Sequence, residues 1–253
     1  MLKLLHLDIE TRPAKVYVWS TWKPHIDVDQ ILEPTSVLCF GAMWDHDETR
    51  TVIYKKAQKV DSLEFRDMIK TIHKLLCEAD AVCHFNGIAF DMPMLNQEFA
   101  RLKLGPTPPI PQIDLKRALN DNFRLVSNRL KFAGPYFGVG AKVEHEGWPL
   151  WIKCLEGNQD AWARMKAYNI GDVVLMPDLY KVLLPWLKQH PNLNLYADDD
   201  GKKRCTHCAS ERVEQRGWRK TSVSTYPRYY CKDCQHWSRG RVAVKREFKV
   251  QAV

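Results

Sequence analysis

The chain begins with short stretches of apolar residues whose length and spacing are those of buried strands. The strands predicted in this way are residues 2–9, 37–44, 51–54, 81–85 and 112–115. The first three follow one another before any helical pattern begins, so we expect them to form an antiparallel meander. A polar turn, DHDET at residues 45–49, separates the second strand from the third.

From residue 61 onward the apolar positions change to helical spacing. Residues 61–79 carry apolar side chains at positions 65, 68, 69, 72, 75 and 76. Further helices are predicted over residues 92–104, 116–121, 126–137, 158–170 and 172–189. A strand that follows a helical crossover must join the sheet in parallel. The pattern therefore predicts an α/β fold, a mixed five-stranded sheet flanked by helices.

The periodic pattern ends near residue 189. Residues 190–203 show no periodicity and are interpreted as a linker, which leaves residues 204–253 as a tail too small to hold a core without a staple. We therefore expect a main domain over residues 1–189, a linker over 190–203 and a small domain over 204–253.

Four cysteines of the tail form two pairs, Cys205-x-x-Cys208 and Cys231-x-x-Cys234. With no secretory signal in view, such pairs favour a metal over disulfides. Four thiolates suit one tetrahedral zinc ion, and the residues between the pairs are interpreted as a β-hairpin, as in a zinc ribbon. His207 and His236 are alternative ligands, but we expect the four cysteines to hold the ion.

The charge of the chain is divided as unevenly as its cysteines. Residues 201–253 contain 14 Lys or Arg and 4 Asp or Glu, a balance of +10, whereas the whole chain carries +8. This asymmetry indicates a tail that meets a polyanion, and a solvated basic tail that aids solubility is the alternative. No signal peptide and no apolar run long enough for a membrane span is seen, so we expect a cytoplasmic protein without membrane contact.

Acidic side chains interrupt the apolar pattern at the end of the first strand. Asp8 and Glu10 stand two positions apart and therefore project from the same face. Two neighbouring carboxylates repel each other unless a cation lies between them, and their oxygens suit Mg²⁺ or Mn²⁺. Two solvated acids at a fraying strand end are the alternative interpretation.

Two more segments carry candidate chemistry. In HFNGIAFDMPML, residues 84–95, Asp91 follows a strand and begins a helix. In YNIGD, residues 168–172, Tyr168 and Asp172 are four positions apart, hence on one helix face.

These motifs, in this order, resemble the DEDD superfamily of 3′–5′ exonucleases, whose fold is ribonuclease H-like. Asp-x-Glu ends the first strand, Asn-Gly-x-x-Phe-Asp follows the fourth, and Tyr-x-x-x-Asp lies on a late helix, as in the tyrosine-containing DEDDy branch. The likeness covers roughly residues 1–185. A closer likeness, through LDIETRP, ILEP, YNIGDVVLMPDLY and LLPW, is to phage-encoded and bacterial exonucleases of this type that end in a zinc ribbon.

The resemblance implies a two-metal mechanism. Two Mg²⁺ or Mn²⁺ ions would be held by Asp8, Glu10, Asp91 and Asp172, and Tyr168 would align the attacking water. By the same likeness, the side chains near the terminal nucleotide would be Ile9, Thr11, Asn86, Gly87 and Phe90. The histidine-containing branch has a His where this chain has Ala167, which excludes its mechanism.

Other residues are assigned by their surroundings. Asp114 is expected to be structural and His84 to be packed beneath the site. Lys142 and His145 are candidate phosphate contacts. Tyr17, Trp19 and Trp22, among cations, either stack unpaired bases or cover the sheet edge. In the ribbon, the side chains that favour nucleic acid over a protein partner are Arg216, Trp218, Arg219, Lys220, Arg228 and Tyr229.

We therefore expect a 3′–5′ exonuclease with one structural Zn²⁺ that acts on DNA or RNA, single-stranded DNA being favoured. A structure-selective endonuclease on the same fold is one alternative, and a non-catalytic nucleic-acid-binding or recruitment protein is the other. No polymerase signature is present, so a role in proofreading would need a partner. A replication or repair protein is therefore a candidate partner. A phage-encoded protein would work in the host cytoplasm.

Overall fold

The computed structural model describes residues 2–22, 24–197 and 200–244. By its contacts the chain forms two compact units, Lys3–Leu179 and a second unit that starts at Tyr180. Compactness alone does not show that a segment folds independently, so the domain boundaries given above stay predictions.

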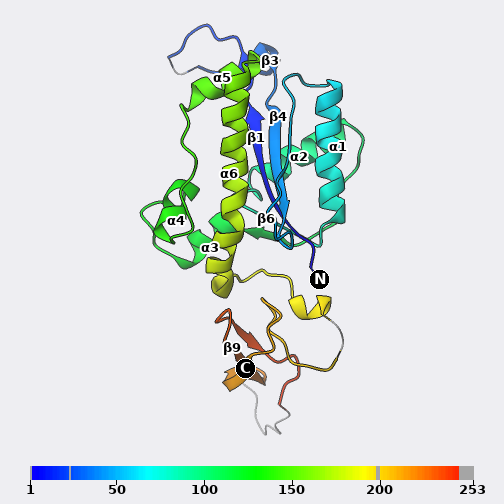
Figure 1. Cartoon of the computed structure of the whole chain (residues 1–253), viewed down its shortest axis with the longest axis vertical. Coiled ribbons are helices and arrows are strands. Elements are labelled where there is room, and N and C mark those ends of the chain that lie inside the picture. Colours follow the sequence, from blue (N-terminus) through cyan, green and yellow to red (C-terminus); the bar gives the residue numbers. More distant parts are fainter. Residues whose placement is uncertain (1, 23, 198–199, 245–253) are drawn as a thin grey trace. The chain divides into compact units, whose positions relative to one another are not determined.

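A five-stranded sheet forms the centre of the first unit (Figure 1). Its strands, in chain order, are β1 (Leu4–Arg12), β4 (Ser36–Trp44), β5 (Ile53–Lys56), β6 (Ala81–His84) and β7 (Gln112–Asp114). The spatial order is β5-β4-β1-β6-β7. β4 is antiparallel to β1 and β5, whereas β6 and β7 are parallel to β1. The predicted meander with parallel additions is confirmed.

Helices cover both faces of this sheet. On one face, α1 (Leu63–Glu78) and α2 (Asp91–Arg101) enclose a core with β1 and β4. On the other, α5 (Trp148–Leu155) and α6 (Gln159–Leu183) pack on β4. The shorter α3 (Leu115–Asn122) and α4 (Leu130–Tyr136) follow β7. The α/β fold class is confirmed.

The sequence pattern fits α1 well. Ser62 accepts a hydrogen bond from the Phe65 amide at 3.1 Å and caps the helix, and the predicted apolar positions are all buried. Burying each large side chain such as Phe65 or Ile72 stabilises the fold by roughly 1.5–3 kcal/mol.

Three local predictions need correction. Residues 158–170 and 172–189 do not form two helices, because α6 runs unbroken from Gln159 to Leu183. The helix predicted over residues 126–137 is shorter, since α4 spans Leu130–Tyr136; residues 137–147 are irregular, and the unpredicted α5 follows them. The short strands β2 (Lys15–Val16) and β3 (Ile31–Glu33), with the 3₁₀ turn η1 (Val28–Gln30) before β3, form a hairpin that the pattern did not indicate.

The aromatic side chains of that hairpin do not cover the sheet. Tyr17, Trp19 and Trp22 are 70%, 100% and 80% exposed. Of the two interpretations above, covering the sheet edge is therefore wrong.

The second unit contains a three-stranded antiparallel sheet. Its strands are β8 (Val213–Lys220), β9 (Thr225–Cys231) and β10 (Trp237–Arg239), in the order β10-β9-β8. The predicted hairpin between the cysteine pairs is confirmed, and β10 is an addition to it. Two 3₁₀ turns, η2 (Leu184–Trp186) and η3 (Leu193–Tyr196), precede this sheet in the chain. In the described part of the chain, no helix has the length and apolar character that crossing a membrane requires.

Candidate active site

The alternation of β1 explains why a core strand carries two acids. Leu5, Leu7 and Ile9 point into the core that α1 closes. Asp8 and Glu10 occupy the intervening positions and therefore project from the opposite face, on the side of α6. The strand is buried on one face and carries a polar site on the other.

A glycine lets α6 approach this strand closely. Gly41 of β4 pairs with Asp8 across the sheet, and a Cβ atom there would lie 2.8 Å from Asn169 Oδ1 and 3.0 Å from Val173. In the space so left, Asn169 Nδ2 donates to Asp8 Oδ2 at 2.7 Å. Asn169 precedes Asp172 by three residues, so both lie on the same helix face.

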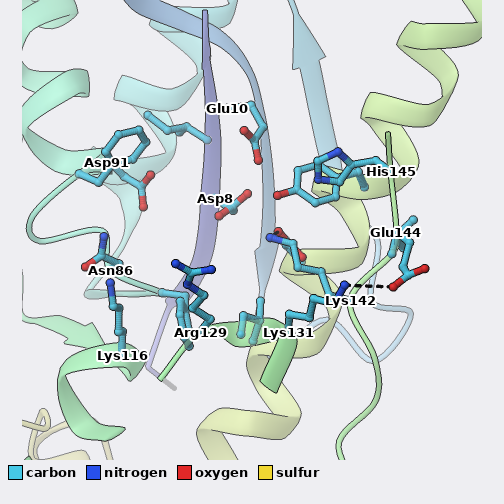
Figure 2. Close-up of a pocket in the computed structure, with 17 residues that line it drawn as sticks. Asp8, Glu10, Asn86, Asp91, Lys116, Arg129, Lys131, Lys142, Glu144 and His145 are labelled. Atoms are coloured by element: carbon cyan, nitrogen blue, oxygen red, sulfur yellow. Dashed lines mark hydrogen bonds and ion pairs between the residues drawn. The ribbon is translucent and has the colours of Figure 1, made fainter. Parts of the chain in front are cut away.

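Three of the four predicted acids form one group. Asp8, Glu10 and Asp172 each place a carboxylate oxygen within 4.8 Å of the others. Asp91, the first residue of α2, lines the same cavity. The structure thus brings side chains from β1, α2 and α6 together (Figure 2).

The protonation of this group differs from that of acids in water. Burial raises the pKa of Glu10 to about 8, with Asp172 and Asp91 adding to the rise and Lys142 opposing it. Burial, with Asp114 nearby, raises the pKa of Asp91 to about 7. The pKa of Asp8 is also raised, by burial and then by the neighbouring acids. Negative charge is therefore concentrated here beyond what the protein itself neutralises.

A divalent cation fits this donor set. The oxygens are hard ligands of the kind that Mg²⁺ and Mn²⁺ prefer. Asp172 Oδ1 is buried without a hydrogen-bond partner among the described residues, while Asp172 Oδ2 is held by Lys142 Nζ at 2.7 Å. An orphaned carboxylate oxygen facing two further acids is available as a ligand.

Tyr168 lines the same cavity as the four acids. Burial followed by the charge of Glu10 raises the pKa of this phenol well above its ordinary value. Lys142 Nζ lies 4.4 Å from its ring centroid and the His145 ring packs edge-on at 4.4 Å. Tyr168 is therefore a neutral hydrogen-bond donor fixed by its neighbours.

The turn after β6 is shaped to hold Asp91. Asn86 has a left-handed backbone (φ 72°), and the Asp114 carboxylate accepts from the Asn86 amide at 3.0 Å and the Ile88 amide at 3.3 Å. A Cβ at Gly87 would lie 1.8 Å from His84 Nδ1 and 2.7 Å from Asp91 Oδ2. Asp114 also accepts from two amides at the start of α3, so the structure shows it bonded to backbone groups.

His84 is fully buried next to this turn. Neither of its ring nitrogens has a hydrogen-bond partner among the described residues, and burial lowers its pKa to about 4. Its ring is neutral and fills the space that Gly87 leaves open.

The acids line a cavity of about 660 Å³ whose other end is basic. Figure 2 shows Lys116, Arg129 and Lys131 below the acids. Lys131 is paired with Glu144 at 3.1 Å, the contact dashed in the figure. Sequence reasoning missed these residues, as it missed Asn169; only Asn169 had a signal, its helical spacing from Asp172.

The predicted substrate contacts are distributed around this cavity. Ile9, Asn86 and Phe90 line it, with Phe90 46% exposed, and so do Lys142 and His145. Thr11 instead lines a neighbouring pocket that shares Glu10. Gly87 lies behind the wall, against His84 and Asp91.

The four tail cysteines form a second candidate metal centre. Their sulfur atoms all lie within 4.8 Å of one another, at 3.4 Å for Cys205–Cys234 and 3.6 Å for Cys208–Cys231. Tetrahedral zinc with Zn–S bonds of about 2.3 Å separates its sulfurs by roughly 3.8 Å, whereas a disulfide needs about 2 Å. The spacing fits zinc.

Both cysteine turns have the same backbone form. The Ala209 amide donates to the Cys205 carbonyl, and the Gln235 amide donates to the Cys231 carbonyl, each at 3.0 Å. Ala209 and Gln235 are both left-handed, with φ of 56° and 62°. Each pair of cysteines is therefore presented by an equivalent turn.

The two histidines of the tail hydrogen-bond elsewhere. His207 Nε2 donates to the Leu187 carbonyl at 2.9 Å and His236 Nδ1 to the Pro185 carbonyl at 3.1 Å. The remaining predicted contacts are on the ribbon strands, namely Arg216, Trp218, Arg219 and Lys220 of β8 and Arg228 and Tyr229 of β9.

Comparison with known proteins identifies the fold. A family model described as the RNase_H superfamily matches residues 30–184, which include Asp91, Tyr168 and Asp172 but begin after β1. A search of curated proteins found no match.

Among solved structures, the chain is similar to the family B DNA polymerase from the hyperthermophilic archaeon Pyrobaculum calidifontis. The TM-score is 0.51 and the identity 18%, over 73% of this chain and 25% of the polymerase. The chain thus spans a quarter of that protein, and an identity this low shows a shared fold alone. The family model, by contrast, spans more than half of the 253 residues. The chain belongs to the RNase_H superfamily.

Proposed function

We propose that this protein is a metal-dependent 3′–5′ exonuclease of the tyrosine-containing DEDD type. One observation carries the proposal: a buried tyrosine, Tyr168, lines the same cavity as three carboxylates whose oxygens lie within 4.8 Å of one another. Membership of the RNase_H superfamily supports nuclease activity, and hence nucleic-acid binding, in general. The direction of digestion rests on the motif resemblance.

Asp8, Glu10 and Asp172, together with Asp91, would hold two Mg²⁺ or Mn²⁺ ions. When bound, such ions make water more acidic and stabilise negative charge on a phosphodiester. The raised pKa values of the acids support this assignment, because a cation at the site would lower them again.

Tyr168 would orient the attacking water. Its neutral hydroxyl can donate a hydrogen bond to a water that lies against the scissile phosphate. His145 and Trp151 pack against the ring and restrict its motion. We assign Lys142 to a phosphate oxygen, which it would reach by leaving Asp172.

The basic end of the cavity would hold the backbone of the strand. Lys116 and Arg129 have no carboxylate partner among the described residues and lie opposite the acids (Figure 2). With the terminal nucleotide near the acids and Phe90, they would contact phosphates further from the 3′ end. Single-stranded DNA is the substrate we favour, and a replication or repair protein is the partner class we favour.

The test is a time course on 5′-labelled oligonucleotides with Mg²⁺ or Mn²⁺. Stepwise shortening of single-stranded DNA, with a 3′-blocked strand and a single-stranded circle left intact, is the expected result. Cleavage of the circle would favour the endonuclease alternative. No metal-dependent release from any substrate would favour the non-catalytic one. Asp8→Asn protein is the control for a contaminating nuclease.

A further inference from the structure

The register of the ribbon strands separates their side chains into two faces. Trp237 pairs with Tyr230, and Arg239 pairs with Arg228, so these four side chains share one face. Tyr226, two positions before Arg228, projects from the same face. Trp218 pairs with Pro227 and therefore projects from the other.

On the first face, three arginines lie over three aromatic rings. Arg216 lies 4.2 Å from the ring centroid of Tyr230, Arg228 lies 4.7 Å from that of Trp237, and Arg239 lies 4.4 Å from that of Tyr226. We call these six residues the arginine ladder. All three strands contribute to it.

A bulge in β8 lies beside Arg228, the middle arginine of the ladder. Gly217 has a left-handed backbone (φ 73°) where the register between Gln215 and Trp218 shifts. Arg228 Nε donates to the Arg216 carbonyl at 2.9 Å, next to this bulge. The guanidinium group is thus held by a ring on one strand and a carbonyl on another.

The charges of the ribbon are neutralised unevenly. Near the cysteines, Arg212 is paired with Asp233 at 2.6 Å and Lys232 with Glu214 at 2.8 Å. Of the ladder, only Arg216 has a carboxylate partner, Glu214, among the described residues. Arg228 and Arg239 therefore keep uncompensated positive charge on the aromatic face.

We propose that the arginine ladder binds single-stranded nucleic acid. A guanidinium group stacked on a ring keeps its N–H edge free for phosphate oxygens, which it can bind in a bidentate manner. The exposed guanidinium planes and the exposed part of the Trp237 ring offer surfaces on which unpaired bases stack, and a duplex hides those base faces. The proposal is independent of hydrolysis, and it assigns binding to a face that does not include Trp218.

Two tryptophans make a matched test. Trp237 in the ladder is 45% exposed and Trp218 on the other face is 47% exposed. In Asp8→Asn protein, which should not degrade the probe, we would measure anisotropy of a labelled 30-nucleotide poly-dT strand. Trp237→Ala should weaken binding by roughly 5- to 100-fold, the range for loss of one stacked base, and Trp218→Ala by less than about twofold.

The arginines are tested through salt dependence. Each phosphate contact to a single strand contributes about 0.7 to the slope of log affinity against log salt. Arg228→Gln combined with Arg239→Gln should flatten the slope by about 1.4, whereas Arg212→Gln, at the cysteine end, should leave it unchanged. Poly-U and a 30-base-pair duplex complete the set, and the duplex should bind more weakly than poly-dT.

Folding and catalysis are checked separately. Zinc content and circular dichroism identify a variant that has lost the ribbon fold. If Trp237→Ala has lost it, Trp237→Phe replaces that variant, because phenylalanine keeps an apolar ring with less stacking area. Equal losses at both tryptophans, or an unchanged slope in the arginine variant, would overturn the proposal. Failure of the exonuclease proposal would give a different result. Protein with an unmodified Asp8 would then bind the strand normally but release no nucleotide.

Discussion

At the residue scale, Asp8 contacts several other parts of the candidate site. Its carboxylate lies within 4.8 Å of those of Glu10 and Asp172, its backbone pairs with Gly41 across the sheet, and its side chain accepts from Asn169. Asp8→Asn keeps an oxygen that can accept from Asn169 but removes the negative charge. We expect metal-dependent hydrolysis to fall below a few per cent while the fold remains. Rates on single-stranded DNA with Mn²⁺ and a circular dichroism spectrum check both parts, and substantial residual cleavage would remove Asp8 from the metal ligands.

Tyr168→Phe tests a smaller contribution. The substitution keeps the ring that His145 and Trp151 contact and removes only the hydroxyl from the cavity of the acids. Losing one orienting hydrogen bond should slow turnover by roughly 10- to 1,000-fold, less than losing a metal ligand. Single-turnover rates make the comparison. Equal rates in the two proteins would mean that another group positions the water.

The acids also predict how stability depends on pH in buffer without divalent ions. The pKa values of Asp8, Glu10 and Asp91 are raised in the folded state, mainly by burial, so between pH 4 and 8 these three acids bind more protons in the folded state than in the unfolded chain. Their contribution to the free energy of unfolding should therefore fall as pH rises through this window, while the buried neutral His84 contributes the opposite change below about pH 6.5.

Asp8→Asn removes one of the titrating groups and should raise the melting temperature more at pH 8 than at pH 5. About 1 kcal/mol corresponds to 2–4 °C in a chain of this size. The melts need no chelator, so the cysteine centre stays intact. An equal change in melting temperature at both pH values would contradict the raised pKa values assigned to the acids.

At the scale of elements, the turn from β6 into α2 holds Asp91 by excluding a side chain at Gly87. Gly87→Ala would place a Cβ atom 1.8 Å from His84 Nδ1. We expect loss of activity and a lower melting temperature, because either the turn or the ring must move. Gly87→Ala with His84→Ala should regain part of the stability. Gly105→Ala is the control, since its surroundings are open and only its positive φ is strained. A Gly87→Ala protein as active as the unmodified chain would show that the turn adapts.

Much of the sheet was predictable because each strand carries its own signal of apolar residues between turns. The two-residue strand β2 has too few positions for any pattern. The helices predicted over residues 158–170 and 172–189 left out Gly171, yet α6 runs through it, and Val143 packs so closely there that a Cβ would lie 2.7 Å from it. That contact joins distant segments and leaves no trace in local sequence.

The candidate site divides in the same way. Asp8, Glu10, Asp91 and Asp172 belong to short motifs at the ends of predicted elements, and the structure gathers them in one cavity. Lys116 and Arg129 belong to no motif. They reach the cavity because α3 and α4 return beneath it, which only the tertiary arrangement decides.

At the scale of the whole molecule, the acids lie in the first unit, and we expect the basic tail to supply the attraction for a polyanion. Cys205→Ser should cost the tail its zinc and its fold. Affinity for a long single strand should then fall and depend less on salt, while hydrolysis of short oligonucleotides at high enzyme concentration should persist. Filter binding at several salt concentrations and a zinc assay measure both effects. Unchanged affinity and slope would point to a protein partner for the tail.

The equivalent turns at Cys205–Ala209 and Cys231–Gln235 bear on the order in which this tail assembles. Each turn is closed by a local hydrogen bond, so either can form early and offer two thiolates to an ion. The second pair then closes a loop of the intervening chain, at an entropic cost that is the same whichever pair bound first. On this account neither turn is the obligatory start of folding, and Cys205→Ser and Cys231→Ser should reduce zinc-induced folding of the tail to the same extent.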